Sequence, residues 1–153
     1  MVKGLVAASL LWPALLAASV WQQAEGRTPV WTSVVYLAGS QICHQRPERT
    51  FETAGVEWPV CGRCSGLYLA APFGALLATA ALAWRRLPRR PVWWLAAAAA
   101  PTALTLGLEW SSLAHVTNVG RFAAAAPLGA AVAFAVVQAA AGPRGRIGYT
   151  DRR

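Results

Sequence analysis

The chain has 153 residues, of which 56% are hydrophobic and only 13% are charged, and its formal net charge is +8. A soluble domain usually has about a quarter of its residues charged, so this composition excludes an ordinary soluble protein and predicts a single membrane domain over residues 1–153. The positive charge does not indicate a nucleic-acid-binding protein, because the arginines flank apolar runs instead of forming one basic stripe.

The first apolar run covers residues 4–21. At about 1.5 Å per residue, a helix of this length is just long enough to cross the hydrocarbon core of a bilayer. A secretory signal peptide is the alternative, with the small residues Ala17, Ala18 and Ser19 as its cleavage site. In both cases the segment that follows lies outside the cytoplasm.

The next segment, residues 30–42, is too short to span a membrane. Its apolar residues recur at helical spacing, which predicts a short helix that lies in the membrane interface or packs on the bundle and leads to Cys43. The polar segment 45–59 contains the breakers Pro47, Gly55 and Pro59 and no strand pattern, so we expect a loop there.

Three more uncharged runs predict membrane helices at residues 65–84, 91–108 and 122–141. A basic turn at residues 85–90 separates the first two, and Pro101 predicts a kink in the second. The fold class expected from these patterns is therefore all-α: a polytopic membrane protein with four transmembrane helices and one short interfacial helix.

The placement of charge orients these spans. If the basic turn and the C-terminal tail lie in the cytoplasm, the inside has a strong excess of arginine, whereas acidic and basic residues balance outside. We therefore expect a multi-pass protein of the cell inner membrane with both termini cytoplasmic and the lipid bilayer as its partner. Residues 22–64 and 109–121 then form one extracytoplasmic polar region. Whether the chain has a protein partner or forms an oligomer stays open.

This polar region contains all three cysteines, Cys43, Cys61 and Cys64, and both histidines, His44 and His115. Zinc and iron accept thiolate and imidazole ligands, and a C-x-x-C spacing lets both sulfurs bind one ion. We expect one zinc or iron ion held by three cysteines and one histidine, either His115 or His44. Five further polar residues are expected to hydrogen-bond and orient the ligands: Glu109, Arg63, Asn118, Arg121 and Arg49.

Other roles for these residues stay open. The C-x-x-C pair is also typical of a membrane thiol–disulfide oxidoreductase that passes electrons to quinone, although such enzymes usually have two cysteine pairs. A structural disulfide with one remaining thiol, or an accessory subunit whose polar region binds a partner, is a further alternative. The sequence therefore does not decide whether the protein is an enzyme.

Two of the orienting residues have simpler alternatives. Glu109 closes the third predicted span, where it could pair with Arg121 or Arg63. Asn118 stands before the fourth span, where Asn commonly caps a helix.

The motifs resemble those of a family of small prokaryotic membrane proteins known as domain of unknown function 2085. The family pattern C-H-Q-x-x-x-R-[ST]-F is matched at residues 43–51, and P-[VI]-C-x-R-C-x-G-x-Y is matched at residues 59–68. Asn118 and Arg121 match its N-x-x-R. The resemblance covers residues 36–129 and departs at Glu109, where the family pattern has Asp. It implies a multi-span membrane fold and brings no established activity.

Overall fold

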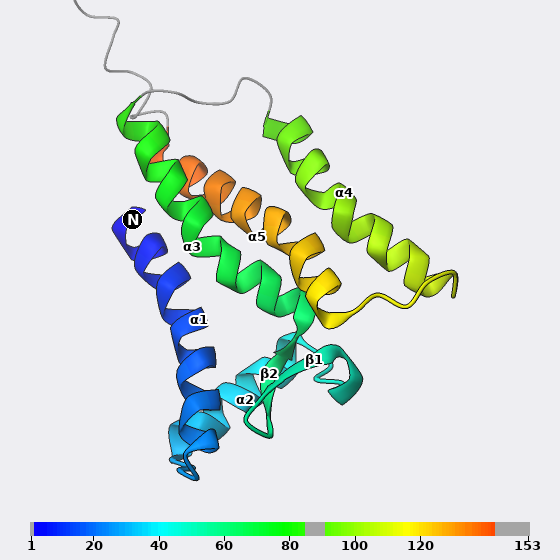
Figure 1. Cartoon of the computed structure of the whole chain (residues 1–153). Coiled ribbons are helices and arrows are strands. Elements are labelled where there is room, and N and C mark those ends of the chain that lie inside the picture. Colours follow the sequence, from blue (N-terminus) through cyan, green and yellow to red (C-terminus); the bar gives the residue numbers. More distant parts are fainter. Residues whose placement is uncertain (1, 85–90, 143–153) are drawn as a thin grey trace, which may run out of the picture.

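The computed structural model describes residues 2–84 and 91–142. The predicted basic turn and the charged C-terminal tail lie outside the described residues. The described chain is mostly helical, and a two-stranded sheet follows its second helix (Figure 1). In chain order the elements are α1 (Val2–Ala24), α2 (Val30–Ile42), the 3-10 turn η1 (Pro47–Arg49), β1 (Thr50–Thr53), β2 (Val56–Cys61), α3 (Gly62–Ala83), α4 (Pro91–Trp110) and α5 (Asn118–Ala141).

Three of the described helices, α1, α3 and α5, are long and apolar enough to cross a membrane. The fourth predicted span, residues 91–108, is also a helix, but α4 is not among these candidates. The fourth span therefore stays a prediction.

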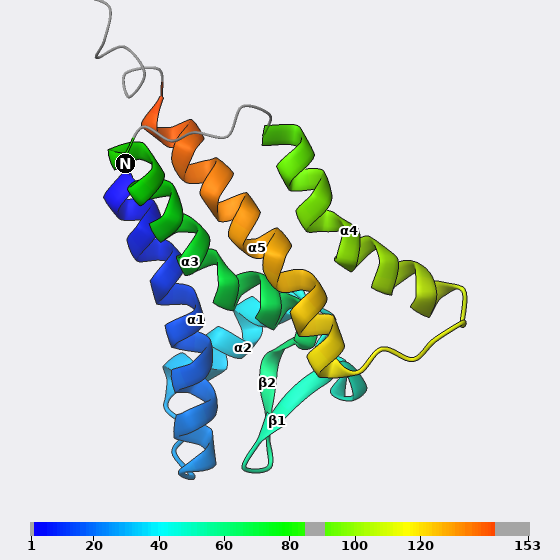
Figure 2. The same cartoon turned by 45° about the horizontal axis from the view of Figure 1, so that its top comes forward.

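The tightest helix packing joins α3 to α5. At Gly66, Gly74 and Gly129 a side chain would collide with the backbone of the facing helix. Glycine at these positions lets the two backbones approach closely, as small residues do between membrane helices. α1 packs on another side of α3 (Figures 1 and 2). α3 is therefore the central helix, with its first turn at the end of the bundle where α2 and the sheet lie.

Helix α4 lies at the edge of the bundle (Figure 2) and makes most of its contacts with α5. No residue from Val92 to Trp110 is fully buried. Thr102 donates a hydrogen bond from its hydroxyl to the Ala124 carbonyl at 2.8 Å. Polar side chains therefore contribute directly to holding α4 in place.

The expectation of an all-α chain with a loop at residues 45–59 is wrong in one respect, because β1 and β2 form an antiparallel hairpin. Its turn places Ala54 and Gly55 at φ 51° and 77°, the left-handed backbone that two-residue hairpin turns require. Pro59 is tolerated inside β2 because the pairing is irregular between the Thr50–Cys61 and Glu52–Glu57 pairs. The hairpin leads Cys61 directly into α3.

The hairpin and α2 are joined by hydrogen bonds. The Gln45 amide donates to the carbonyls of Tyr36, at 2.8 Å, and Pro59, at 2.7 Å. The Tyr36 hydroxyl donates to the Glu57 carbonyl at 2.5 Å. A side chain at Gly39 would collide with the Pro59 carbonyl, so α2 and β2 pack closely. These contacts fix the end of α2 relative to the start of α3.

Candidate metal site

The three cysteines come together at the start of α3. Cys43 directly follows α2, Cys61 ends β2, and Cys64 lies in the first turn of α3. Their sulfur atoms all lie within 4.8 Å of one another. The backbone N–H of Cys61 donates a hydrogen bond to the Cys43 sulfur at 3.2 Å. We call these three residues the thiol cluster.

Apolar side chains surround the thiol cluster. Cys43 is 8% exposed and packs in one core with the buried Leu16 of α1, Val35 of α2 and Val60 of β2. Trp12, Trp31 and Tyr68 pack against the same core, and Cys61 and Cys64 are partly exposed beside it. Helix α1 therefore supplies part of the apolar shell around the thiol cluster.

The local structure stabilises a thiolate on Cys61. The neighbouring Cys64 side chain, as a hydrogen-bonding partner for the Cys61 sulfur, lowers the pKa of Cys61 to about 5. Burial acts in the opposite direction, and the backbone N–H groups of Cys64 and Arg63 reinforce the decrease. These N–H groups belong to the N-terminus of α3, where the helix dipole favours negative charge.

Neither histidine belongs to the thiol cluster. His44 follows Cys43 but is exposed, and His115 is exposed in the link between α4 and α5. The group of possible ligand atoms that lie within 4.8 Å of one another consists of the three sulfurs and contains no histidine nitrogen. The described chain therefore brings together three of the predicted donors, and a histidine as the fourth ligand stays a prediction.

A second polar cluster lies on another side of α3. Arg63 donates through Nη2 to Glu109 Oε2 at 2.6 Å, and Arg121 donates through Nε and Nη2 to Glu109 Oε1 at 2.8 and 2.5 Å. The three side chains are only 7–13% exposed. Glu109 therefore pairs with both Arg63 and Arg121, whereas the sequence indicated one or the other as its partner.

Asn118 also belongs to this group but does not cap α5. The N-cap is Thr117, whose side chain accepts a hydrogen bond from the Gly120 N–H at 3.1 Å. The Asn118 amide instead donates to the Thr50 carbonyl at 2.7 Å and accepts from Arg121 at 2.6 Å. We call Arg63, Glu109, Asn118 and Arg121 the charge cluster.

Asn118 also connects the two clusters, because Thr50 pairs with Cys61 across the hairpin. Arg49 ends η1, and its side chain takes part in none of the hydrogen bonds or ion pairs found among the described residues of either cluster. Sequence reasoning assigned no role to Gln45 or Thr50, whose hydrogen bonds set the hairpin in place. Their positions inside the motif at residues 43–51 were the available signal.

Comparison with known proteins finds a family match and a short match to a relative. A family model described as "Predicted membrane protein (DUF2085)" matches residues 43–135, a range that includes both clusters. An uncharacterized protein of Methanothermobacter thermautotrophicus is 60% identical over 30 residues. That match covers 20% of this chain and 27% of the relative, so the chain matches about a quarter of the relative's length. No solved structure matches.

Proposed function

The chain belongs to the DUF2085 family of predicted membrane proteins, and we propose that it binds one zinc or iron ion through Cys43, Cys61 and Cys64. The observation that carries the proposal is the grouping of three sulfurs within 4.8 Å of one another, although they follow or belong to three different elements. Thiolates at this separation can all bind a single ion.

The chemistry of three adjacent thiols favours a cation over a disulfide. A disulfide joins two sulfurs and leaves the third unused, whereas one ion uses all three. Several thiolates in an apolar shell repel one another, and a divalent ion removes that repulsion. The backbone N–H that donates to the Cys43 sulfur stabilises a thiolate acceptor in the way that hydrogen bonds around metal-bound cysteines do.

The fourth ligand distinguishes two kinds of site. If His44 or His115 turns inward, the ion has four protein ligands, as in structural zinc sites. If solvent fills the position, the site resembles catalytic zinc sites, which keep three protein ligands and one open position. The exposure of both histidines permits either arrangement, and alanine variants of each separate the two.

We also propose that α4 is the fourth span, that the thiol cluster lies outside the cytoplasm and that both termini lie inside. The charge asymmetry of the sequence supports this orientation. The ion pairs of Glu109 support α4 as a span, because they hold its end beside the starts of α3 and α5. A membrane-impermeant maleimide applied to intact cells after chelation should then label the cysteines. Labelling only after permeabilisation would show that the thiol cluster lies on the cytoplasmic side.

The experiment that tests the metal site is elemental analysis of the protein purified in detergent, together with alkylation of its thiols. We expect about one equivalent of zinc or iron and three cysteines that resist alkylation until a chelator is added. A metal-free protein in which Cys61 and Cys64 form a disulfide and Cys43 alkylates freely would contradict the proposal.

A second candidate function is thiol–disulfide exchange. Its support is that Cys61 and Cys64 are partly exposed, while Cys43 lies close enough to exchange with either. Oxidation of two thiols to a disulfide releases two electrons and two protons, which a membrane quinone would accept to become quinol. Purified protein that reduces quinone in step with loss of free thiols would favour this function; no reduction, with metal bound, would exclude it.

A further inference from the structure

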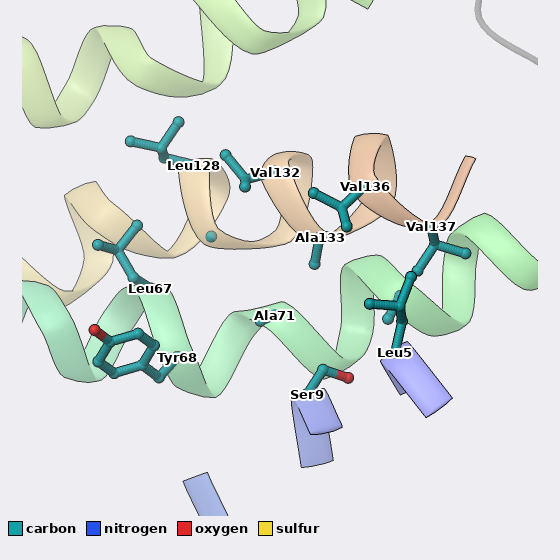
Figure 3. A pocket seen from close by; sticks show the side chains of 12 residues that line it. Leu5, Ser9, Leu67, Tyr68, Ala71, Leu128, Val132, Ala133, Val136 and Val137 are labelled. Atoms are coloured by element: carbon teal, nitrogen blue, oxygen red, sulfur yellow. The ribbon is translucent and has the colours of Figure 1, made fainter. Parts of the chain in front are cut away.

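A groove of about 490 Å³ lies among α1, α3 and α5, and its Tyr68 end adjoins the core that surrounds the thiol cluster. Figure 3 shows Leu67 and Tyr68 at one end and Leu5 and Val137 at the other. Alanine side chains of α3, such as Ala71, line it between these ends. Because alanine fills little volume, a hollow remains between the larger side chains of α1 and α5.

The chemistry of the groove excludes a polar ligand. Its lining is almost entirely apolar. The hydroxyl of Ser9 already donates to the Val6 carbonyl at 2.8 Å. A bound water needs two to four polar partners, so ordered water has no place here. A hydrocarbon is the class of ligand that this surface fits.

The groove is closed at its ends and open along its side. At one end Trp12 packs edge-to-face on Tyr68, with ring centroids 6.1 Å apart. At the other end Leu5 packs against the core that contains Val137. Val132 and Val136 of α5 line the groove and are 45% and 47% exposed, so the side is accessible.

The occupant follows from the helices that form the groove. The groove is formed by α1, α3 and α5, the three described helices that are long and apolar enough to cross a membrane. Its open side therefore faces the hydrocarbon of the bilayer. From Tyr68 to Ala75 the groove follows α3 for roughly 10 Å at about 1.5 Å per residue, which is part of the length of one lipid chain. We propose that the groove binds one acyl chain of a bilayer phospholipid.

Packing provides the driving force. An acyl chain gains no hydrophobic free energy when it moves from bulk lipid into the groove, since both surroundings are apolar. An empty groove, however, leaves its lining atoms without dispersion contacts, and a chain restores them. The proposal depends on the membrane character of the protein and not on the metal, so either proposal can fail alone.

Photocrosslinking in vesicles tests the groove. The full-length protein is reconstituted in phosphatidylethanolamine and phosphatidylglycerol with a trace of phospholipid that carries a diazirine in the middle of one acyl chain. Adducts are mapped by mass spectrometry. We expect adducts on Val132 and Val136 to exceed by severalfold those on Leu104 of α4, which is 64% exposed. Adducts that follow exposure alone would overturn the proposal.

Two variants separate occupancy of the groove from general lipid contact. Ala71→Phe fills the groove and should reduce its adducts severalfold, whereas Ala97→Phe on the exposed surface of α4 should leave them unchanged. Equal adducts in Ala71→Phe and wild type would overturn the proposal. Groove adducts obtained with an isoprenoid-quinone probe but not with the acyl probe would also overturn it. If Ala71→Phe fails to fold, the distribution of adducts over the wild-type protein still tests the proposal.

Discussion

The thiol cluster and the charge cluster begin at neighbouring residues of α3, Cys64 and Arg63, yet they have opposite characters. In the charge cluster, both oxygens of Glu109 accept hydrogen bonds from arginines. In the thiol cluster, three sulfurs face one another inside an apolar shell. One group of side chains is largely satisfied by its own members, whereas the other has the donors for a ligand.

This difference indicates different roles for the polar groups of the two clusters. The charge cluster joins α4 to α3 and α5, so its polar groups hold the bundle together. The thiol cluster joins the ends of α2 and β2 to the first turn of α3, but its hydrogen bonds leave the sulfurs able to bind an ion. We therefore place the proposed chemistry at the cysteines and assign the charge cluster a supporting role.

Replacement of a cysteine should have the largest effect. Cys43→Ser, Cys61→Ser and Cys64→Ser should each reduce bound metal to roughly a tenth or less of wild type, because hydroxyls are far weaker ligands for zinc or iron than thiolates. Elemental analysis measures this. Ser65→Ala is the matched control, since Ser65 is buried beside Cys64 and its hydroxyl has no partner among the described residues. Normal metal content in Cys43→Ser would show that Cys43 is not a ligand and would contradict the three-cysteine site.

Glu109→Gln should mainly destabilise the fold. It leaves two mostly buried arginines without their counter-charge, a change that typically costs about 3–5 kcal/mol. Thermal unfolding in detergent should show a lower melting temperature. The control is Glu25→Gln, which breaks the exposed Glu25–Arg27 pair and should cost about 0–1 kcal/mol. Equal melting temperatures for the two variants would show that the charge cluster does not brace the bundle.

Asn118→Ala tests the connection between the clusters. Loss of the bond from Asn118 to the Thr50 carbonyl should loosen the strand pair that positions Cys61 and weaken metal binding roughly tenfold, as changes to ligand-supporting residues do. A competition titration with a chelator measures the affinity. Thr117→Ala removes the neighbouring helix cap, costs about 1 kcal/mol of stability and should leave the affinity unchanged. Equal losses of metal affinity in both variants would mean that Asn118 affects metal binding only through the stability of α5.

The smallest effect concerns pH. In protein stripped of metal, the lowered pKa of Cys61 predicts that this thiol becomes reactive as pH rises through about 5, because the thiolate is the reactive form. Cys64→Ala removes the hydrogen bond that lowers this pKa most, so the midpoint should move to higher pH. Alkylation rates followed by mass spectrometry give both midpoints. An unchanged midpoint in Cys64→Ala would exclude the proposed hydrogen bond.

Much of the helical framework could be predicted from the sequence. Val30–Ile42 is a helix as expected, and the predicted runs at residues 4–21, 65–84, 91–108 and 122–141 all lie within helices apart from the last residue of the second run. Uncharged runs and helical spacing are local properties of the chain, so they can be read without tertiary contacts. The family membership could also be predicted, because its motifs are contiguous in sequence.

The hairpin and the residue roles could not be predicted in the same way. The strands contain Glu52, Glu57 and Pro59, and their pairing depends on the turn at Ala54 and Gly55 and on contacts with α2. The same limit applies to Asn118. Its position before an apolar run suggests a cap, but its amide meets a strand 68 residues earlier in the chain.

The sequence by itself determined the long helices, the short helix before Cys43 and the gathering of polar residues into two loops. Only the tertiary structure decided which of those polar residues meet. Arg63 and Cys64 are adjacent, but successive residues of a helix point about 100° apart, so Arg63 contacts α4 while Cys64 contacts the other cysteines. The direction of each side chain depends on where the helix begins and what packs around it, and the hairpin sets that beginning at Gly62.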